Sequence, residues 1–293
     1  MSALPDPLRS LIAAEADAPA PPAARAFAER FAARPGVVAV LFYGAMMRDD
    51  AGSGLMDLYV LTDRARDWSG PGLAAAGCRM LPPNVHHERQ GEAAAKVAVL
   101  TLAAFRRRMR VRSRDTTLWA RFAQPVRLLH ARDAAARAAV LEALEEAAAT
   151  ASWWAARLSE ARDAETVWRD LFAATYGAEL RVEPAGRSRD LVAAAPERWR
   201  LLHETLIAPA RPDAQARRRA ARAWGRRRRI GKALNLARLV KAAFTFRGGL
   251  PYIVSKIERH GGRPLELRPW ERRLPWLAAP VVMLRLLREK RLR

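Results

Sequence analysis

The chain has 293 residues, of which 51% are hydrophobic, so it can bury a core and is not a disordered polymer. Lys and Arg number 52 against 30 Asp and Glu, which gives a formal net charge of +22. A charge of this sign attracts nucleic acid, an anionic membrane or a phosphorylated substrate, although a solvated basic surface with no specific partner is the simpler interpretation. With a single cysteine, Cys78, an internal disulfide is excluded and a reducing compartment is expected.

The first third of the chain alternates between helical and strand patterns. A short N-terminal helix is followed by an Ala/Pro-rich linker over residues 17–24 and a helix over 26–33. Residues 37–43 are apolar and β-branched, as in a strand buried on both faces, and a polar loop over 44–54 follows. Residues 56–61 then predict a strand with Asp57 and Tyr59 on one face and Met56, Leu58 and Val60 on the other.

Later segments become steadily more helical. We predict strands over residues 78–81, 96–101 and 125–129, and short helices over 105–110 and 116–123. From residue 133 to about 175 the pattern is helical almost without interruption, and further helices are predicted over 196–207 and, very basic, over 213–241. The change of composition near Asp133 predicts a domain boundary, and the chain as a whole is expected to be α+β.

The segment from Val37 to Leu61 carries the residues best suited to chemistry. A Gly-Ala pair after a buried strand, Gly44-Ala45, lets backbone amides approach a triphosphate. An aspartate on the next strand, Asp57, can hold Mg²⁺ between phosphates and an attacking group. This order resembles the DNA-polymerase-beta-type nucleotidyltransferase superfamily, whose usual pattern is Asp-x-Asp at this strand. Here Tyr59 stands at the place of the second carboxylate.

With a single aspartate at this strand, the segments Tyr43-Gly44-Ala45 and Met56 to Tyr59 resemble a narrower family, the mitochondrial-type phosphatidate cytidylyltransferases and their bacterial relatives. Ala45 stands in place of the family's serine. These enzymes make CDP-diacylglycerol from CTP and phosphatidic acid. Further matches follow in the same order along roughly residues 37–260: Pro83 to His87, Lys96 to Val99, Leu118 to Arg121, Gln124 to Arg127, Tyr176 to Arg181, Lys241 to Thr245, and Pro251 to Lys256. Each match is short, and their common order is what makes the resemblance specific.

The resemblance implies a role for each matched position. Asp57 and Glu179 would be the catalytic carboxylates and Mg²⁺ ligands, with Lys96 as a further catalytic residue. The nucleotide would contact Tyr43, Gly44, Ala45, Arg121 and Arg181. The lipid phosphate would contact His86, His87, Lys241, Thr245 and Lys256.

Each assignment has a plainer alternative. Asp57 can be a structural acid at a strand end, Lys96 a solvated edge lysine, and Glu179 a partner of nearby arginines. A zinc site at His86-His87 is not indicated, because no second pair at ligand spacing follows. Trp153, Trp154 and Trp168, at helical spacing, predict core packing.

Two basic segments favour a polyanionic surface. The arginine-rich run 217–232 suits nucleic acid or anionic lipid equally. Residues 265–293 mix Trp, aliphatic and basic residues, which is typical of a helix in the headgroup region or, alternatively, of a packed terminal helix.

We therefore predict four parts of the chain: an N-terminal helix and linker (1–24), a nucleotidyltransferase domain (25–132), a helical domain contributing to the site (133–264) and a basic amphipathic, membrane-contacting tail (265–293). With no secretory signal and no apolar run of about 20 residues, we expect a cytoplasmic enzyme bound peripherally to the inner face of a membrane. An RNA-directed nucleotidyltransferase and a non-catalytic lipid- or nucleic-acid-binding relative are the alternatives.

Overall fold

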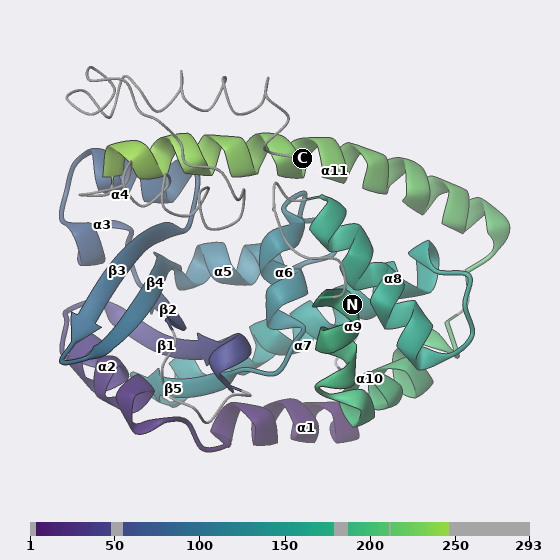
Figure 1. Ribbon diagram of the computed structural model, residues 1–293, viewed down its shortest axis with the longest axis horizontal. Coiled ribbons are helices and arrows are strands. Elements are labelled where there is room, and N and C mark those ends of the chain that lie inside the picture. The colour runs from purple at the N-terminus through teal and green to yellow at the C-terminus, as the bar shows by residue number, and fades with distance from the viewer. Residues whose placement is uncertain (1–3, 48–54, 179–186, 211, 246–293) are drawn as a thin grey trace.

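A five-stranded mixed sheet with helices on both faces makes the protein α+β, as predicted (Figure 1). The computed structural model describes residues 4–47, 55–178, 187–210 and 212–245. The strand order is β3-β4-β2-β1-β5. Only β2 and β4 are parallel, and the other neighbouring strands are antiparallel. The strands span Val37–Tyr43 (β1), Met56–Thr62 (β2), Asn84–Gln90 (β3), Ala93–Thr101 (β4) and Arg127–Ala131 (β5).

The central strands β1, β2 and β4 are buried because both faces of the sheet are covered. Alternate side chains enter two separate hydrophobic clusters. Tyr59 and Leu61 join the larger cluster, and Leu58 and Val60 join the smaller one. The predicted division of the β2 side chains between two faces is therefore confirmed.

The smaller cluster lies under α2 (Pro22–Ala32), whose Phe27 and Phe31 are fully buried. The short helix α3 (Arg66–Ser69) adds Trp68, which meets Phe31 edge to face. The N-terminal helix α1 (Asp6–Asp17) instead inserts Leu8 and Ile12 into the larger cluster.

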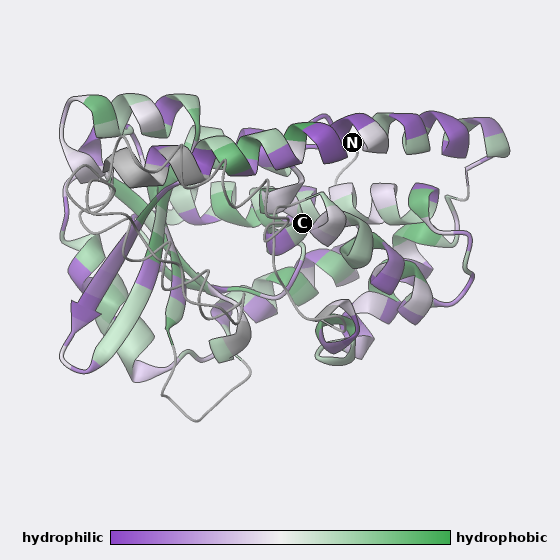
Figure 2. Ribbon diagram, turned by 45° about the horizontal axis from the view of Figure 1, so that its top comes forward, coloured by the Kyte–Doolittle hydropathy of each residue, from purple (hydrophilic) through white to green (hydrophobic). Residues whose placement is uncertain are grey.

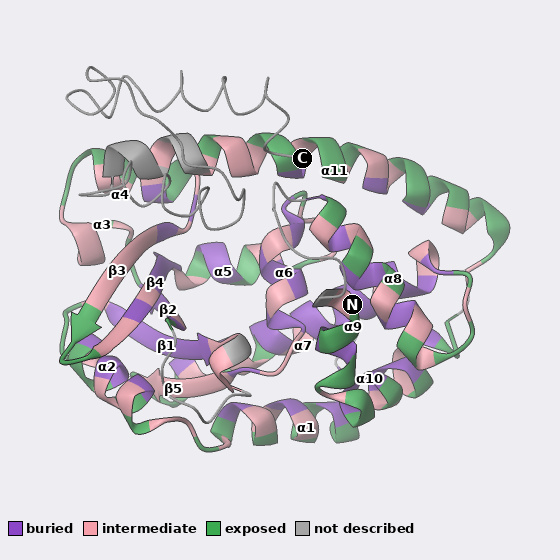
Figure 3. Cartoon of the chain, viewed as in Figure 1, coloured by how far each residue is buried: buried purple, intermediate pink, exposed green. Residues whose placement is uncertain are grey.

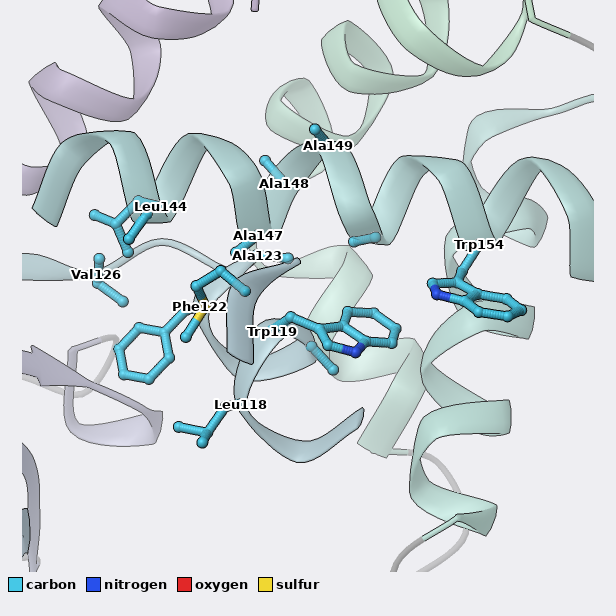
Figure 4. Packing of buried hydrophobic residues seen from close by; sticks show 14 of the residues in the cluster. Leu118, Trp119, Phe122, Ala123, Val126, Leu144, Ala147, Ala148, Ala149 and Trp154 are labelled. Atoms are coloured by element: carbon cyan, nitrogen blue, oxygen red, sulfur yellow. The ribbon is translucent and has the colours of Figure 1, made fainter. Parts of the chain in front are cut away.

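The larger cluster joins the other face of the sheet to the helical part of the chain. Its helices are α5 (Leu102–Met109), α6 (Thr116–Phe122), α7 (Ala134–Leu158), α8 (Ala164–Gly177), α9 (Arg187–Ala193), α10 (Pro196–Leu202) with a π-turn over His203–Ile207, and α11 (Ala214–Thr245). Figure 4 shows Trp119 and Phe122 of α6 beneath the alanines of α7. Small side chains on α7 let the two helices approach closely. The cluster takes residues from both sides of Asp133, so the sheet and the helices share one core.

The long predicted helix over residues 133–175 is two helices. Helix α7 ends at Leu158, and α8 begins after Asp163, whose carboxylate accepts from the Thr166 amide at 2.8 Å. An N-cap aspartate supplies the acceptor that a helix start needs. Ser159, at the end of α7, donates to Asp170 of α8 at 2.5 Å and holds the corner. The buried Trp154 and Trp168 confirm the predicted core packing of these helices.

The predicted strand over residues 78–81 is wrong. These residues end helix α4 (Leu73–Met80), where the Cys78 thiol contacts the Val99 carbonyl at 3.4 Å. A short apolar run does not distinguish a strand from a helix, and the preceding run of alanines favours the helix. Strand β3 was not predicted, because its sequence, NVHHERQ, is polar. Among the described strands it lies at an edge of the sheet and pairs only with β4.

Within the described part of the chain, no helix combines the length and the hydropathy that crossing a membrane requires.

Candidate functional site

One row of cross-strand neighbours brings the predicted site residues of four strands together. Tyr43 on β1 lies opposite Asp57 on β2, which lies opposite Lys96 on β4, which lies opposite His87 on β3. Residues directly opposite one another in a sheet project from the same face. The row therefore places an aromatic ring, a carboxylate, an ammonium and an imidazole in sequence on the face that carries Tyr59.

Asp57 and Lys96 form the charged centre of this row. The Asp57 Oδ1 and Lys96 Nζ atoms are 3.8 Å apart, and each side chain is about one-third exposed, at 33% and 29%. Partial exposure leaves both groups accessible to a solute, and the 3.8 Å spacing is that of a loose ion pair. Such a pair can open to admit a phosphate at the lysine and a cation at the aspartate.

Gly44 allows the chain leaving β1 to pass directly over Asp57. Its φ of +101° is one that side-chain-bearing residues rarely adopt, and a Cβ there would lie 3.2 Å from Asp57 Oδ2. The 3₁₀ turn η1 (Ala45–Met47) follows at once. Gly44 thus brings backbone close to the Asp57 carboxylate, an approach that the predicted role of the Gly44-Ala45 pair needs.

Arg121 approaches the row from α6 and is held by two tyrosines. Its Nη1 donates to the Tyr59 hydroxyl at 2.5 Å. The guanidinium carbon lies 5.1 Å from the centre of the Tyr43 ring and 5.8 Å from that of Tyr59. Both distances are within the range of cation–π attraction. The tyrosines thus hold a cation near Asp57, as the predicted nucleotide-binding role of Arg121 requires.

Tyr59 is a neutral hydrogen-bonding group in this setting. Burial raises its pKa, and the charge and hydrogen bond of Arg121 offset only part of that increase. The phenol therefore stays protonated at neutral pH. Tyr59, at the position that the sequence resemblance matches to a second carboxylate, accepts a hydrogen bond from an arginine and cannot act as an anionic metal ligand.

The two adjacent histidines point to opposite faces of β3. His87 pairs with Lys96 in the row, whereas His86 pairs with Val97 and its ring lies 5.9 Å from that of Trp68 on the other face. Burial is the largest of the effects that lower the pKa of His86. His87 is therefore close to the candidate site, and His86 is separated from it by the sheet.

Lys241 is engaged in holding the chain between α4 and β3. Its Nζ donates to the carbonyls of Leu81 and Pro83 at 2.6 and 2.7 Å and to Asn84 Oδ1 at 2.9 Å. Burial, followed by the nearby Arg238 and Arg108, lowers the pKa of Lys241 to about 8, although Cys78 acts in the opposite sense. These three hydrogen bonds give Lys241 a structural role, and its contact with a lipid phosphate stays a prediction.

Arg238 was not identified from the sequence, although it lies one helical turn from Lys241. It donates to the Pro82 carbonyl at 3.0 Å and forms a buried ion pair with Asp115, which Arg108 also approaches. Burial would raise the pKa of Asp115, but Arg238 and Arg108 together keep it below its ordinary value. The positive charge of Arg238 also reaches Tyr59. The i,i+3 spacing of Arg238 and Lys241 on a helix was the available signal.

The remaining predicted residues lie outside what the structure describes. Glu179, Arg181 and Lys256 belong to undescribed segments, and of Thr245 only the backbone, at the end of α11, is described. Within residues 4–47, 55–178, 187–210 and 212–245, no three His, Cys, Asp or Glu side chains gather closely enough to hold a metal. Asp57 nevertheless fits Mg²⁺, which is commonly bound by one or two carboxylates together with substrate phosphates and water.

Comparison with known proteins gives little further constraint. No family model matches the sequence, and no curated protein does. A solved structure of a nucleotidyltransferase-like protein from Exiguobacterium sibiricum aligns with 92% of this chain and 91% of its own, at 13% identity and a TM-score of 0.29. That TM-score is too low to transfer the fold or the activity of that protein to this chain.

Proposed function

We propose that the protein is a nucleotidyltransferase that transfers the cytidylyl group of CTP to phosphatidate, forming CDP-diacylglycerol and pyrophosphate at a membrane surface. The observation that carries the proposal is the row in which Asp57 lies between Tyr43 and Lys96, with Gly44 against its carboxylate. A carboxylate flanked by cations and by a closely approaching glycine is suited to a metal–triphosphate complex.

The cations of the site match the charge of the nucleotide. Lys96 and Arg121 approach the face of the sheet that carries Asp57, and both would neutralise phosphate oxygens. Asp57, with Glu179 proposed as a second carboxylate, would hold Mg²⁺. The ion would supply further neutralisation of the triphosphate when bound. The preference for CTP rests on the family resemblance of the motifs.

The absence of a base at Tyr59 favours a phosphate acceptor. A hydroxyl nucleophile must lose a proton, and the buried, protonated Tyr59 hydroxyl is not a group that takes one at neutral pH. The phosphate of phosphatidate is already ionised at that pH. One of its oxygens attacks the α-phosphorus of CTP in line. The bond to the β-phosphate breaks and pyrophosphate leaves, so atoms and charge balance without a protein base.

Substitution of Asp57 tests the reaction. We expect Asp57→Asn to reduce the conversion of labelled CTP and phosphatidate vesicles to CDP-diacylglycerol at least about a hundredfold. Asn would no longer hold the metal ion that neutralises the triphosphate. The matched control is Asp63→Asn, at a half-exposed aspartate that pairs with Arg132 just beyond β2. It should leave turnover within about twofold.

The measurement also separates the alternatives. Product formation that needs both Mg²⁺ and Asp57 supports the proposal. Folded wild-type protein that binds labelled CTP but forms no product would point to a non-catalytic relative. Transfer of label from CTP to RNA in place of lipid would point to the RNA-directed enzyme.

A further inference from the structure

Helix α11 carries a long cationic face that the site chemistry does not use. Its 32 residues contain no Asp or Glu. The exposed basic residues on it are Arg218, Arg219, Arg222, Arg226, Arg228, Arg229 and Lys232. At about 1.5 Å per residue, they form an array roughly 21 Å long. Hydrophilic colours dominate this part of α11 in Figure 2, and Figure 3 shows exposed residues recurring along it.

The opposite face of α11 fixes the direction of the cations. Trp224 is buried, with its ring centre 5.0 Å from that of Trp154 and 6.2 Å from that of Trp119. Gly231 is also buried, and a Cβ there would lie 2.4 Å from the Ala178 carbonyl oxygen. A helix tied down along one side at these two positions cannot rotate, so the exposed cations are held toward solvent.

The adjoining loop brings two further exposed cations next to α11. Arg227 donates to the carbonyls of Val111 and Ser113 at 3.2 and 3.1 Å. These bonds fix the loop between α5 and α6 against α11. Arg112 and Arg114 of that loop are exposed. Two neighbouring segments thus carry exposed arginines, one bound to the other through Arg227.

Further along, α11 is connected to the candidate site. Arg238 and Lys241 hold the segment that leads into β3, and β3 carries His87 of the row of cross-strand neighbours. The helix therefore presents its cations to solvent on one side and braces an edge of the site on the other. A surface that binds α11 would thus contact the same helix that holds the segment leading into β3.

We infer that the exposed face of α11 docks the protein on an anionic bilayer, which deepens the function proposed above and rests on its lipid acceptor. Anionic headgroups attract each nearby Lys or Arg without a specific contact geometry. An extended array of arginines is suited to this kind of attraction. Single-stranded nucleic acid is disfavoured, because Trp224 of α11 is buried and cannot stack on bases. Between Arg218 and Lys232 the one other exposed residue is Ala221, so the attraction is electrostatic.

Co-sedimentation of the full chain with vesicles tests the docking surface. The vesicles are phosphatidylcholine alone or with 30% phosphatidylglycerol, and they lack phosphatidate so that the catalytic site is not the attachment point. The test variant is Arg218→Gln, Arg222→Gln, Arg226→Gln and Arg229→Gln combined. Each removed charge weakens binding about fivefold, so we expect a loss of at least about a hundredfold on the anionic vesicles.

The matched control removes the same number of charges from the opposite side of the molecule. Arg9, Arg25, Arg30 and Arg200 are exposed on α1, α2 and α10, which lie across the molecule from α11 in Figure 1. Their combined change to Gln should weaken vesicle binding less than about fivefold. Equal losses in the two variants would mean that net charge alone drives binding, and the inference would then be wrong.

Two further outcomes are decisive. If the α11 variant binds anionic vesicles like the wild type, or if wild type prefers RNA or duplex DNA to the vesicles at the same ionic strength, α11 is not a bilayer-docking face. Asp57→Asn separates this inference from the enzymatic proposal, because that variant should lose turnover and still bind vesicles normally. Conversely, the α11 variant should retain turnover of a short-chain phosphatidate that is dispersed in solution.

Discussion

At the scale of single residues, the role of a side chain in the candidate site depends on the residues that it contacts. Tyr59, which the sequence resemblance matches to a carboxylate position, serves here as the hydrogen-bond acceptor of Arg121. Lys96 similarly lies 3.8 Å from Asp57, and in the proposed function it would receive a phosphate beside that carboxylate. Site chemistry here comes from pairs of residues.

Removing the Tyr59 hydroxyl should loosen Arg121. We expect Tyr59→Phe to lower kcat/KM for CTP about tenfold while costing at most about 1.5 kcal/mol in the free energy of unfolding. The check is a double-mutant cycle with Arg121→Lys, followed by steady-state kinetics. In the Arg121→Lys background the Tyr59 change should have little further effect, and full additivity would show that Tyr59 does not act through Arg121.

At the scale of elements, α11 holds the approach to β3 through Lys241 and Arg238. These contacts were not predicted from the sequence, where residues 213–241 were notable for charge and Lys241 was matched to a lipid-phosphate contact. The hydrogen bonds from Arg238 and Lys241 order the start of β3, an edge strand with few apolar residues of its own. An edge strand that is polar needs such outside contacts to remain in register.

The lowered pKa of Lys241 predicts a pH dependence of stability. Its pKa of about 8 in the folded protein lies below the ordinary 10.5, so between these values the unfolded chain binds more protons than the folded one. Stability from this group therefore rises with pH across that window and is constant below it. We expect the free energy of unfolding of the wild type, relative to Lys241→Met, to increase from pH 8 to about 10.5 in urea titrations. A difference that is flat or falls over that range would contradict the pKa assignment.

At the scale of the whole molecule, one hydrophobic cluster joins the sheet to the helices. Trp154 of α7 occupies the junction, where its ring meets Trp224 of α11 and Arg227 lies 4.4 Å from its centre. Because this ring touches both the core and the cationic helix, its loss should affect the stability of the whole chain and the orientation of α11 together.

Truncating Trp154 should be costly, whereas a smaller aromatic should be tolerated. Trp154→Ala is expected to lower the free energy of unfolding by about 3–5 kcal/mol through lost packing and a cavity. Trp154→Phe should cost less than about 2 kcal/mol, because the indole nitrogen makes no hydrogen bond among the described residues. Chemical denaturation of both variants measures the difference, and equal costs would argue against a packing role.

The sequence alone was sufficient for the central strands, the two faces of β2 and most helices. Apolar runs and a period of two report burial locally, which is why Asp57 and Tyr59 were assigned correctly to one face. Polar β3, the helix at residues 78–81 and the corner at Ser159 were missed or wrong. An edge strand, a short apolar run and a cap depend on partners distant in sequence or on single hydrogen bonds.

For the candidate site, the sequence supplied the residue types, and only the tertiary structure decided which of them meet. No local pattern states that Lys96 lies opposite Asp57, that His87 shares their row while His86 faces away, or that Tyr59 binds Arg121 from α6. Strand register and helix placement are set by burial of the whole core, a long-range free energy that no short window of sequence contains.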